Sequence, residues 1–543
     1  MSSSLSLTFK YLTKTKNEAA IDVLVAGLDS PGPSTRDLAL RALLDRPHAR
    51  GHREVFKRLK ALDGLCREIV SQRPESLARV AGEAVQNGEN GVCTAACEAV
   101  LSFRLYEAMP ALVSVVSRPG HPNVGPAAQT VLRLTEQLYA ELCAPEDQAS
   151  RRDLDGVRRW ITSTLEVGVR KFNVHRRREV IEAFLLVAKQ QNVVLRQVLQ
   201  YPQDANHQAV VEILATSPQG GVIRLLLSFL EEPQLPQVVK NVLANRCDLK
   251  FVKNLLQMVR ARSQRSVQET FGRLDRLSWA EPGHEVLRKL DDSGQRDAVR
   301  LLAATSIERS QPLKVFAYLL AEGTTEGSRA AAEALAEFQG PEADAVAIKA
   351  LNNRDPVIRA HLIRQLRPRK IPGAMSLLIR MVDHPHVEVR AALRDSLPEF
   401  TVGHFLANFE ALPESWAATV GNLVRKIDVE GVPLLQRELE SLSPVRRRRA
   451  VQVASAMGLV RELEQKIVGL MSDEDHMVRI EVARALADCE TMPSWEALRD
   501  ALLDRSVIVQ EAAEQSLEQI SRSLAEEADQ EQTAQGKSRE AVL

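Results

Sequence analysis

The stretch HPHVEVRAALRDSL, residues His384–Leu397, has the pattern of a short turn followed by an amphipathic helix. Two further stretches nearly repeat it, RDPVIRAHLIRQL at Arg354–Leu366 and EDHMVRIEVARAL at Glu474–Leu486. In each, a valine or isoleucine stands directly before an arginine, and a leucine follows seven residues after that arginine. A phrase that recurs with fixed internal spacing indicates one structural unit used several times.

The spacing of these arginines, which we call the register arginines, gives the length of the unit. Most neighbours in the series are separated by about 31 residues, and the same step leads from the last of them to Gln510. The longer interval between Arg390 and Arg448 spans about two periods. We call the unit inside it, whose repeat pattern is not recognisable, the blurred unit. The period near 31 therefore predicts a repeat array whose register arginines are Arg296, Arg329, Arg359, Arg390, Arg448 and Arg479.

Each unit is predicted to contain two helices. In the clearest unit, residues 371–382 form the first helix, and residues 387–397 form the second. The second helix places apolar residues at steps of four, which gives one continuous apolar stripe. The stripes of four units are Val389, Leu393 and Leu397; Ile358, Leu362 and Leu366; Val478, Val482 and Leu486; and Val509, Ala513 and Leu517.

The second helices also carry start signals. Asp355 precedes Pro356 in DPVIR, and Asp475 holds the same place in DHMVR. An aspartate there can accept hydrogen bonds from the free amide groups of the helix N-terminus, and a proline at the first turn loses no helical hydrogen bond. Asp355 and Asp475 are therefore predicted capping residues of the repeat.

The pattern divides the chain into four parts. We predict a lead segment at residues 1–16, irregular helical repeats at 17–290, regular repeats at 291–520, and a polar, disordered tail at 521–543, where apolar periodicity is lost. No convincing run of alternating strand pattern occurs. The chain is therefore predicted to be all-α.

The DPxVR-type opening, the alanine-rich second helix and the period near 31 resemble HEAT-like repeats, including the short kind found in phycobilisome lyases. The resemblance is specific over residues 290–520. It implies a right-handed α-solenoid whose second helices line the concave side. Known members are mostly scaffolds and adaptors, with a few enzymes and chromophore chaperones, so the resemblance alone does not choose a function.

The register arginines together could form a row of ligand-binding groups along the array, but a structural role is favoured. The register arginine lies in the first turn of the second helix, beside the capping aspartate. There a guanidinium can bridge turn carbonyls and carboxylates of adjoining repeats. Each repeat cannot bury its apolar face alone, so contacts between repeats stabilise the array.

Composition narrows the class of protein. The 71 basic residues balance 71 acidic ones, which argues against a dedicated nucleic-acid coat. The six cysteines are scattered without a disulfide framework, and Cys93 and Cys97 are interpreted as small core residues. The lysines near the N-terminus follow its apolar patch, the wrong order for a secretory signal. We therefore expect a cytoplasmic protein.

The sequence offers no evidence for an active site. The motifs GxxxxGK[ST], GxGxxG, HExxH and GxSxG do not occur. The best metal-like cluster, DHPHVE at Asp383–Glu388, is interpreted as a solvated repeat turn. We predict no catalysis, no cofactor and no metal.

Charged surfaces suggest where a partner would bind. Positions five residues beyond the register arginines carry Arg364, Asp395 and Arg484, a strip of mixed sign that suits a protein partner. We predict a scaffold or adaptor that binds a protein along residues 355–515, with a basic rim at Arg446, Arg447, Arg448 and Arg449. The alternatives are a nucleic-acid-binding solenoid that uses basic clusters such as 169–178 and 258–265, and a lyase-type accessory or chaperone protein.

Overall fold

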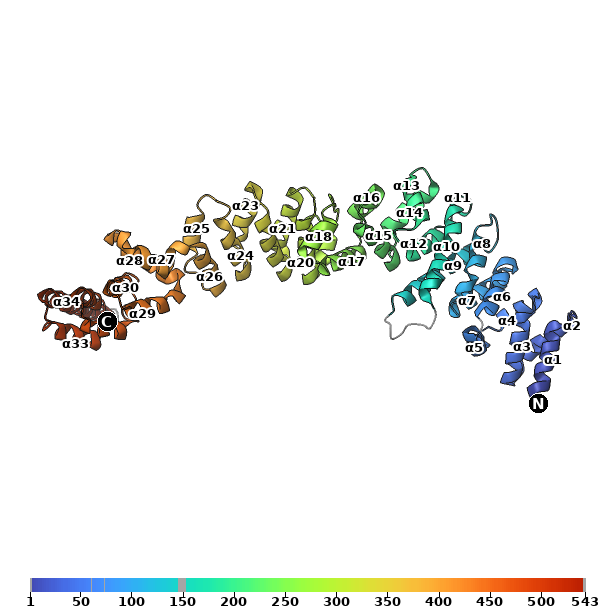
Figure 1. Cartoon of the computed structure of the whole chain (residues 1–543), viewed down its shortest axis with the longest axis horizontal. Helices are drawn as coiled ribbons and strands as arrows, with labels where there is room; N and C mark the ends of the chain where they lie inside the picture. The colour runs from blue at the N-terminus through green and yellow to red at the C-terminus, as the bar shows by residue number, and fades with distance from the viewer. Residues whose placement is uncertain (1, 60, 73, 145–152, 541–543) are drawn as a thin grey trace. The chain divides into compact units, whose positions relative to one another are not determined.

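The computed structural model describes residues 2–59, 61–72, 74–144 and 153–540. Within these ranges the chain forms α-helices, short 3-10 turns and connecting loops, without a β-strand. Successive helices pack as pairs, and the pairs stack on one another (Figure 1). The prediction of an all-α solenoid built from HEAT-like helical pairs is confirmed.

The chain divides into two compact units, Met1–Pro312 and Leu313–Leu543. The helices of the first unit are α1 (Ser2–Lys14), α2 (Ala19–Leu28), α3 (Pro33–Asp45), α4 (Ala49–Lys57), α5 (Asp63–Gln72), α6 (Pro74–Asn87), α7 (Asn90–Ser102), α8 (Met109–Val116), α9 (Val124–Leu142), α10 (Leu154–Arg170), α11 (Phe172–His175), α12 (Arg178–Val187), α13 (Val193–Gln200), α14 (Ala205–Thr216), α15 (Gly220–Ser228), α16 (Gln237–Asn245), α17 (Leu249–Arg260), α18 (Gln264–Phe271), α19 (Glu285–Lys289) and α20 (Asp292–Ala304).

The second unit holds the more regular repeats. Its helices are α21 (Ser310–Glu322), which begins just before the division, α22 (Thr325–Ala334), α23 (Pro341–Ala350), α24 (Pro356–Leu366), α25 (Ala374–Arg380), α26 (Val387–Ser396), α27 (Val402–Asn408), α28 (Glu414–Ile427), α29 (Val432–Leu439), α30 (Pro444–Ala456), α31 (Glu464–Gly469), α32 (His476–Leu486), α33 (Met492–Ala501) and α34 (Val507–Glu540).

The apolar stripes of the second helices form the core of the second unit. Helix α22 packs on α24 and α24 on α26, and in the same way α30 packs on α32 and α32 on α34. All the predicted stripe residues are buried except Leu517, which is half-buried. The spacing of apolar residues therefore identified the buried faces correctly, because each stripe packs against the second helix of a neighbouring repeat.

In several repeats, the turn before the second helix is closed by a side chain six residues ahead of the register position. The backbone N–H of Asp475 donates to Asp473 Oδ1 at 2.9 Å, and that of Ser506 donates to Asp504 Oδ1 at 2.8 Å. Asn353 closes the turn before α24 in the same way. These are Asx turns, in which a short polar side chain replaces a backbone acceptor. The repeat is thus defined by its turn as well as by its stripe.

The blurred unit lies between α26 and α30. Helix α27 spans only Val402–Asn408, and α28 has no arginine or lysine before Arg425. This unit still buries Val402, Phe405 and Val424 in the core that it shares with α30. The long interval between the register arginines of α26 and α30 is thus two repeats, the first of which keeps the helical pair but has no register arginine.

Helices occupy both ends of the described chain. Within the lead segment, Ser2–Lys14 form α1, which packs on α3, and Arg46 donates to the carbonyl oxygen of Leu12 at 2.7 Å. The tail, predicted as disordered from residue 521, continues α34 to Glu540, and residues 541–543 lie outside the described residues. Its alanine, glutamate and glutamine residues have high helix propensity, which the loss of apolar periodicity concealed.

Among the described helices, none is individually long and apolar enough to cross a membrane. One bent pair, Ala205–Thr216 followed by Gly220–Glu231, meets the length and composition requirement only when its two helices are taken together.

Candidate functional site

Arg479 shows most fully how a register arginine is used. Its Nη1 donates to the carbonyl oxygens of Asp473 at 2.7 Å and Glu474 at 3.2 Å, in the turn before its own helix. Its Nε and Nη2 donate to the two carboxylate oxygens of Asp504, at 2.8 and 2.9 Å. Asp504 closes the turn of the next repeat. One buried side chain therefore fastens two consecutive turns together.

The other register arginines share parts of this arrangement. Arg359 donates to Asn353 O and approaches His384 in the next turn, and Arg390 donates to the carbonyl oxygens of His384 and Pro385, the latter at 2.7 Å. Arg329 reaches Asp355, the cap of α24, at 2.8 Å. Arg296 lies 3.6 Å from the buried Asp297.

The register in the RRRR stretch requires a correction. Arg447, rather than Arg448, donates to the carbonyl oxygen six residues before it, Ser441 O, at 2.7 Å. Arg447 also binds both carboxylate oxygens of Asp473 in the next repeat, at 2.6 and 2.8 Å. The repeat period alone cannot distinguish four adjacent arginines, so it assigned the register position to Arg448 instead of Arg447.

The caps behave as helix-start residues. Asp355 accepts from the backbone N–H of Val357, and Asp475 from that of Met477, both at 2.8 Å.

The hydrogen bond from Arg479 is the main reason that the pKa of Asp504 lies below its ordinary value, although burial opposes it. The arginines and carboxylates at the turns are therefore already occupied within the chain.

The predicted binding strip on the second helices carries its own ion pairs. Arg364 lies 3.1 Å from Asp395, which holds the same position one repeat later, and both side chains are about half-exposed. Arg484 lies 3.6 Å from Glu481 on the same helix. The strip is accessible, but its charges largely satisfy one another.

The predicted basic rim is also largely neutralised. Arg446 is paired with Glu438, and Arg449 with Glu410 at 2.6 Å, while Arg447 holds Asp473. Arg448 buries an Nε that has no hydrogen-bond partner among the described residues. The stretch therefore joins helices within the chain more than it offers a free positive surface.

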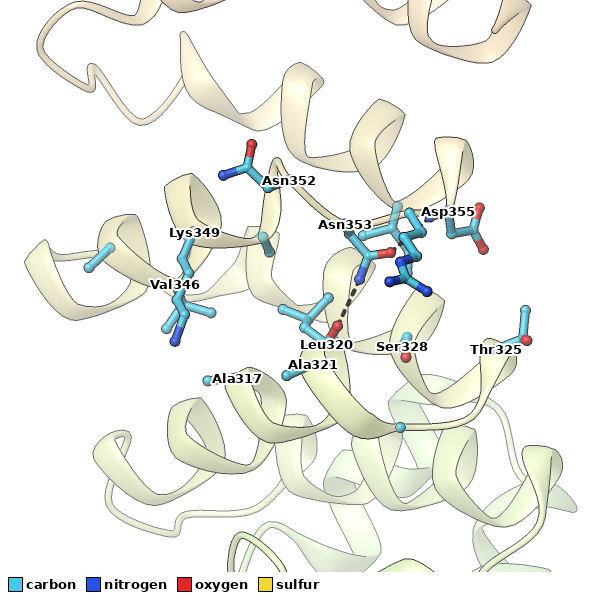
Figure 2. A pocket seen from close by; sticks show the side chains of 15 residues that line it. Ala317, Leu320, Ala321, Thr325, Ser328, Val346, Lys349, Asn352, Asn353 and Asp355 are labelled. Carbon is cyan, nitrogen blue, oxygen red and sulfur yellow. Dashed lines mark hydrogen bonds between the residues drawn. The ribbon is translucent and has the colours of Figure 1, made fainter.

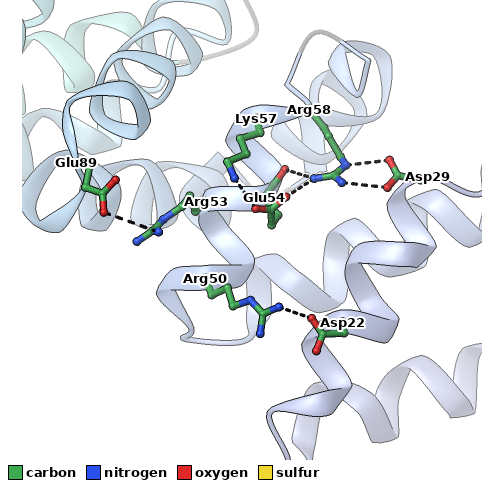
Figure 3. A network of polar contacts seen from close by, with 8 residues as sticks. All are labelled: Asp22, Asp29, Arg50, Arg53, Glu54, Lys57, Arg58 and Glu89. Atoms are coloured by element: carbon green, nitrogen blue, oxygen red, sulfur yellow. Dashed lines mark hydrogen bonds and ion pairs between the residues drawn. The ribbon is translucent and has the colours of Figure 1, made fainter.

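Ion pairs join repeats at the start of the chain as well. Arg58, directly after α4, donates to Asp29, directly after α2, at 2.8 and 3.1 Å, and to Glu54 at 2.5 Å (Figure 3). Arg50 donates to Asp22 at 2.6 Å. Hydrogen bonds from Lys57 and Arg58 lower the pKa of Glu54. With 54 arginines against 17 lysines, the chain uses forked donors throughout for such contacts.

A different surface lies on the first-helix side of the second unit, where α21 and α23 leave a pocket of about 780 Å³ between them. Helix α21 contributes Ala317, Leu320 and Ala321, and α23 contributes Val346 and Lys349 (Figure 2). The floor is formed where Asn353 donates to Leu320 O at 2.7 Å, which ties the loop after α23 to α21 (Figure 2).

A second pocket of about 610 Å³ follows between α23 and α25, and it shares Asn352 with the first. Its lining includes Ile348, Leu377, Met381 and Arg380. We call the two pockets together the first-helix groove. Over the same stretch the second helices α22, α24 and α26 pack directly on one another.

Sequence reasoning missed the first-helix groove. Its available signal was the small side chains on the first helices, such as Ala317, Ala321 and Ala345, where larger residues would fill the space between repeats. Alanine is also an ordinary helix former, so this signal alone does not mark a groove.

The described residues contain no group of three or more histidine, cysteine, aspartate or glutamate side chains arranged to hold a metal ion. His384 and His386 of the DHPHVE turn have rings 5.3 Å apart, and His384 Nδ1 accepts from the backbone N–H of His386. His384 therefore closes its turn in the way that Asp473 and Asp504 close theirs.

No protein-family model matches the sequence, and no curated protein matches it. Among solved structures, importin beta is similar at 12% identity, with 95% of this chain and 82% of that one covered and a TM-score of 0.24. UNC-45 from Drosophila melanogaster is similar at 13% identity over 96% of this chain and 83% of that one, with a TM-score of 0.18. Kap121p bound to Nup53p is similar at 14% identity, with 87% of this chain and 54% of that one covered and a TM-score of 0.24.

The matched region thus spans about half the length of Kap121p. TM-scores of 0.18 to 0.24 mean that the backbones do not superpose over their full length. The fold assignment therefore rests on the helical pairs and the repeated turns of this chain.

Proposed function

We propose that this protein is a non-catalytic scaffold, and that its first-helix groove binds an extended segment of a partner protein that carries apolar and acidic side chains. The observation that carries the proposal is the charge around the groove. Lys349, Arg354 and Arg380 line it without a carboxylate partner among the described residues.

The acidic residues of the groove are already paired. Asp355 is bound to Arg329 at 2.8 Å, and Asp383 to Lys426 at 2.7 Å. A groove with an apolar lining, and with Lys349, Arg354 and Arg380 each lacking a carboxylate partner among the described residues, therefore complements a segment that supplies leucine-like side chains and carboxylates. Burial of the apolar side chains would supply most of the affinity, and the cations would fix the orientation.

The test begins with selection of displayed twelve-residue random peptides on the full-length protein. We expect the selected peptides to combine large apolar residues with aspartate or glutamate. Reversing the charge of the groove with Lys349→Glu and Arg354→Glu should weaken binding by about 1–3 kcal/mol, since two charge-assisted contacts are lost.

A matched control reverses two charges elsewhere on the second unit. Arg437→Glu and Arg461→Glu alter exposed cations that do not line the groove. Equal binding by the groove variant and the wild type, or selection of basic peptides, would refute the proposal.

The second-helix strip at Arg364, Asp395 and Arg484 is the competing protein-binding surface. Its ion pairs must be broken before a partner can use these charges, which costs energy that the groove does not require. Charge reversal of Arg364 and Arg484 together separates the two surfaces: the selected peptides should still bind this variant with unchanged affinity.

A further inference from the structure

A basic cluster in the first unit remains unused by the contacts described so far. Arg158 of α10, Lys189 after α12 and Arg224 of α15 line two adjacent pockets of about 440 and 340 Å³, which share Arg158 and Lys189. Arg159 lines the larger pocket and Arg224 the smaller one. We call these four residues the α10–α15 basic cluster.

Two of the guanidinium groups are held in place by other parts of the fold. Arg158 Nε donates to the carbonyl oxygen of Val187 at the end of α12, at 2.8 Å. The Arg224 guanidinium lies over the ring of Tyr139 with 4.9 Å between Cζ and the ring centroid, and its Nη1 lies 3.6 Å from Cys143 Sγ. A cation fixed over an aromatic face keeps its position without a counter-ion.

A glycine brings the two arginines into the same region. A Cβ on Gly221 would lie 2.7 Å from the carbonyl oxygen of Leu186 and 2.9 Å from Tyr139 Cε2. Only glycine therefore lets α15 approach α12 and the end of α9 this closely. Burial, and then the neighbouring charge of Arg224, lower the pKa of Arg158. A lowered arginine pKa with these causes indicates that two partly desolvated cations lie near each other.

No carboxylate that lines the two pockets forms an ion pair with the cluster among the described residues, and the negative charge of Asp155 offsets the repulsion at Arg158 only in part. Glu231 is paired with Arg262 at 2.7 Å, and Glu166 accepts from Asn192 at 2.8 Å. Asp155 is the remaining carboxylate that lines them, and it forms no ion pair with the cluster among the described residues. Around Arg58 at the start of the chain, by contrast, two carboxylates hold one guanidinium (Figure 3).

We propose that the α10–α15 basic cluster binds a phosphate-bearing ligand with at least two negative groups, one directed to each pocket. Guanidinium forks suit phosphoryl oxygens because two N–H groups can bond one group at once, and Lys189 adds a mobile point charge between the pockets. The ligand relieves the repulsion between Arg158 and Arg224. The site lies in the first unit and the first-helix groove in the second, so either proposal can fail without the other.

The test is isothermal titration of the full-length protein with inorganic pyrophosphate at constant ionic strength. The variant Lys189→Gln with Arg224→Gln removes two cations and leaves the hydrogen bond between Arg158 and Val187 in place. We expect pyrophosphate to bind the wild type and to bind this variant at least about tenfold more weakly.

A matched control removes two cations from the same unit that are already paired. Arg178→Gln and Lys240→Gln take partners from Glu212 and Asp275, and pyrophosphate affinity should stay within about twofold of the wild type. Equal weakening in this control overturns the proposal, because the effect would then be one of net charge alone. The absence of pyrophosphate binding by the wild type overturns it as well.

Sedimentation with vesicles separates the two sources of such a ligand. Vesicles that contain a phosphatidylinositol bisphosphate, compared with phosphatidylcholine vesicles, would carry down the wild type and leave the double variant in solution if the ligand is a lipid headgroup. Pyrophosphate binding without sedimentation supports a soluble phosphorylated ligand at the same site.

Discussion

At the scale of single residues, arginine serves this chain where lysine cannot. Arg479 bonds four oxygen atoms in two turns, and Arg447 bonds three in the preceding pair of turns. A lysine ammonium is a compact point charge and cannot span two turns with a planar fork. The preference for arginine therefore has a geometric reason at the repeat turns.

Removing the Arg479 side chain should be costly. Arg479→Ala leaves Asp504 without its partner in a nearly buried place, so we expect a loss of about 3–5 kcal/mol in local stability. Hydrogen exchange of the amides in α32 and α34 measures this loss directly. The exposed Arg484→Ala on the same helix should change it by less than about 0.5 kcal/mol, and similar losses for both would contradict the assigned role.

The same ion pair predicts a pH dependence. The hydrogen bond from Arg479 lowers the folded-state pKa of Asp504 below its ordinary value of 3.8, so the pair stabilises the fold fully at neutral pH. This contribution is lost as the pH falls below the ordinary value and through the lowered folded pKa. Asp504→Asn should therefore flatten the acid dependence of unfolding near α34, and an unchanged acid profile would count against the pair.

Residue register was also where sequence reasoning was least secure. The period located Arg359, Arg390 and Arg479 because each stands beside one clear valine or isoleucine. It failed among Arg446–Arg449, where the hydrogen bonds to Ser441 and Asp473 identify Arg447. The pairing of Arg364 with Asp395 was within reach of the sequence, since equivalent positions one period apart lie side by side in a repeat array.

At the scale of helices, the apolar stripes of the second helices stabilise the second unit. Leu393 is 1% exposed and lies between α24 and the following repeat. We expect Leu393→Ala to cost about 2–5 kcal/mol, because it leaves a cavity that both neighbours share. Urea unfolding of the second unit, followed by far-ultraviolet circular dichroism, checks this value, and a loss below about 0.5 kcal/mol would mean that the stripe is not packed in this way.

Glycines give a matched pair of tests at the same scale. A Cβ on Gly421 of α28 would collide with the backbone of Ala456 at the end of α30, whereas one on Gly469 of α31 meets nothing within 4 Å. Gly421→Ala should therefore lower the melting temperature. Gly469→Ala should leave it unchanged or raise it, since alanine loses less backbone entropy on folding. The reverse order would contradict the close packing of α28 on α30.

At the scale of the whole molecule, the sequence predicted the class of fold but not the first-helix groove. A repeated apolar stripe determines that helices stack, because every unit solves the same packing problem. The width of the first-helix groove depends instead on how far α21, α23 and α25 stand from one another, and no single residue reports that distance. The length of α34 depended on helix propensity in a segment without apolar periodicity.

The central claim, that a partner segment occupies the first-helix groove, is tested most directly by site-specific photo-crosslinking. The full-length protein would carry a photoreactive amino acid at Val346, inside the groove, or at Arg484, on the second-helix strip, and the crosslinked segment would be sequenced by mass spectrometry. We predict crosslinks from position 346 to an acidic, apolar segment of one protein, lost when Lys349→Glu and Arg354→Glu are added. Crosslinks from position 484 with none from position 346 would contradict the account.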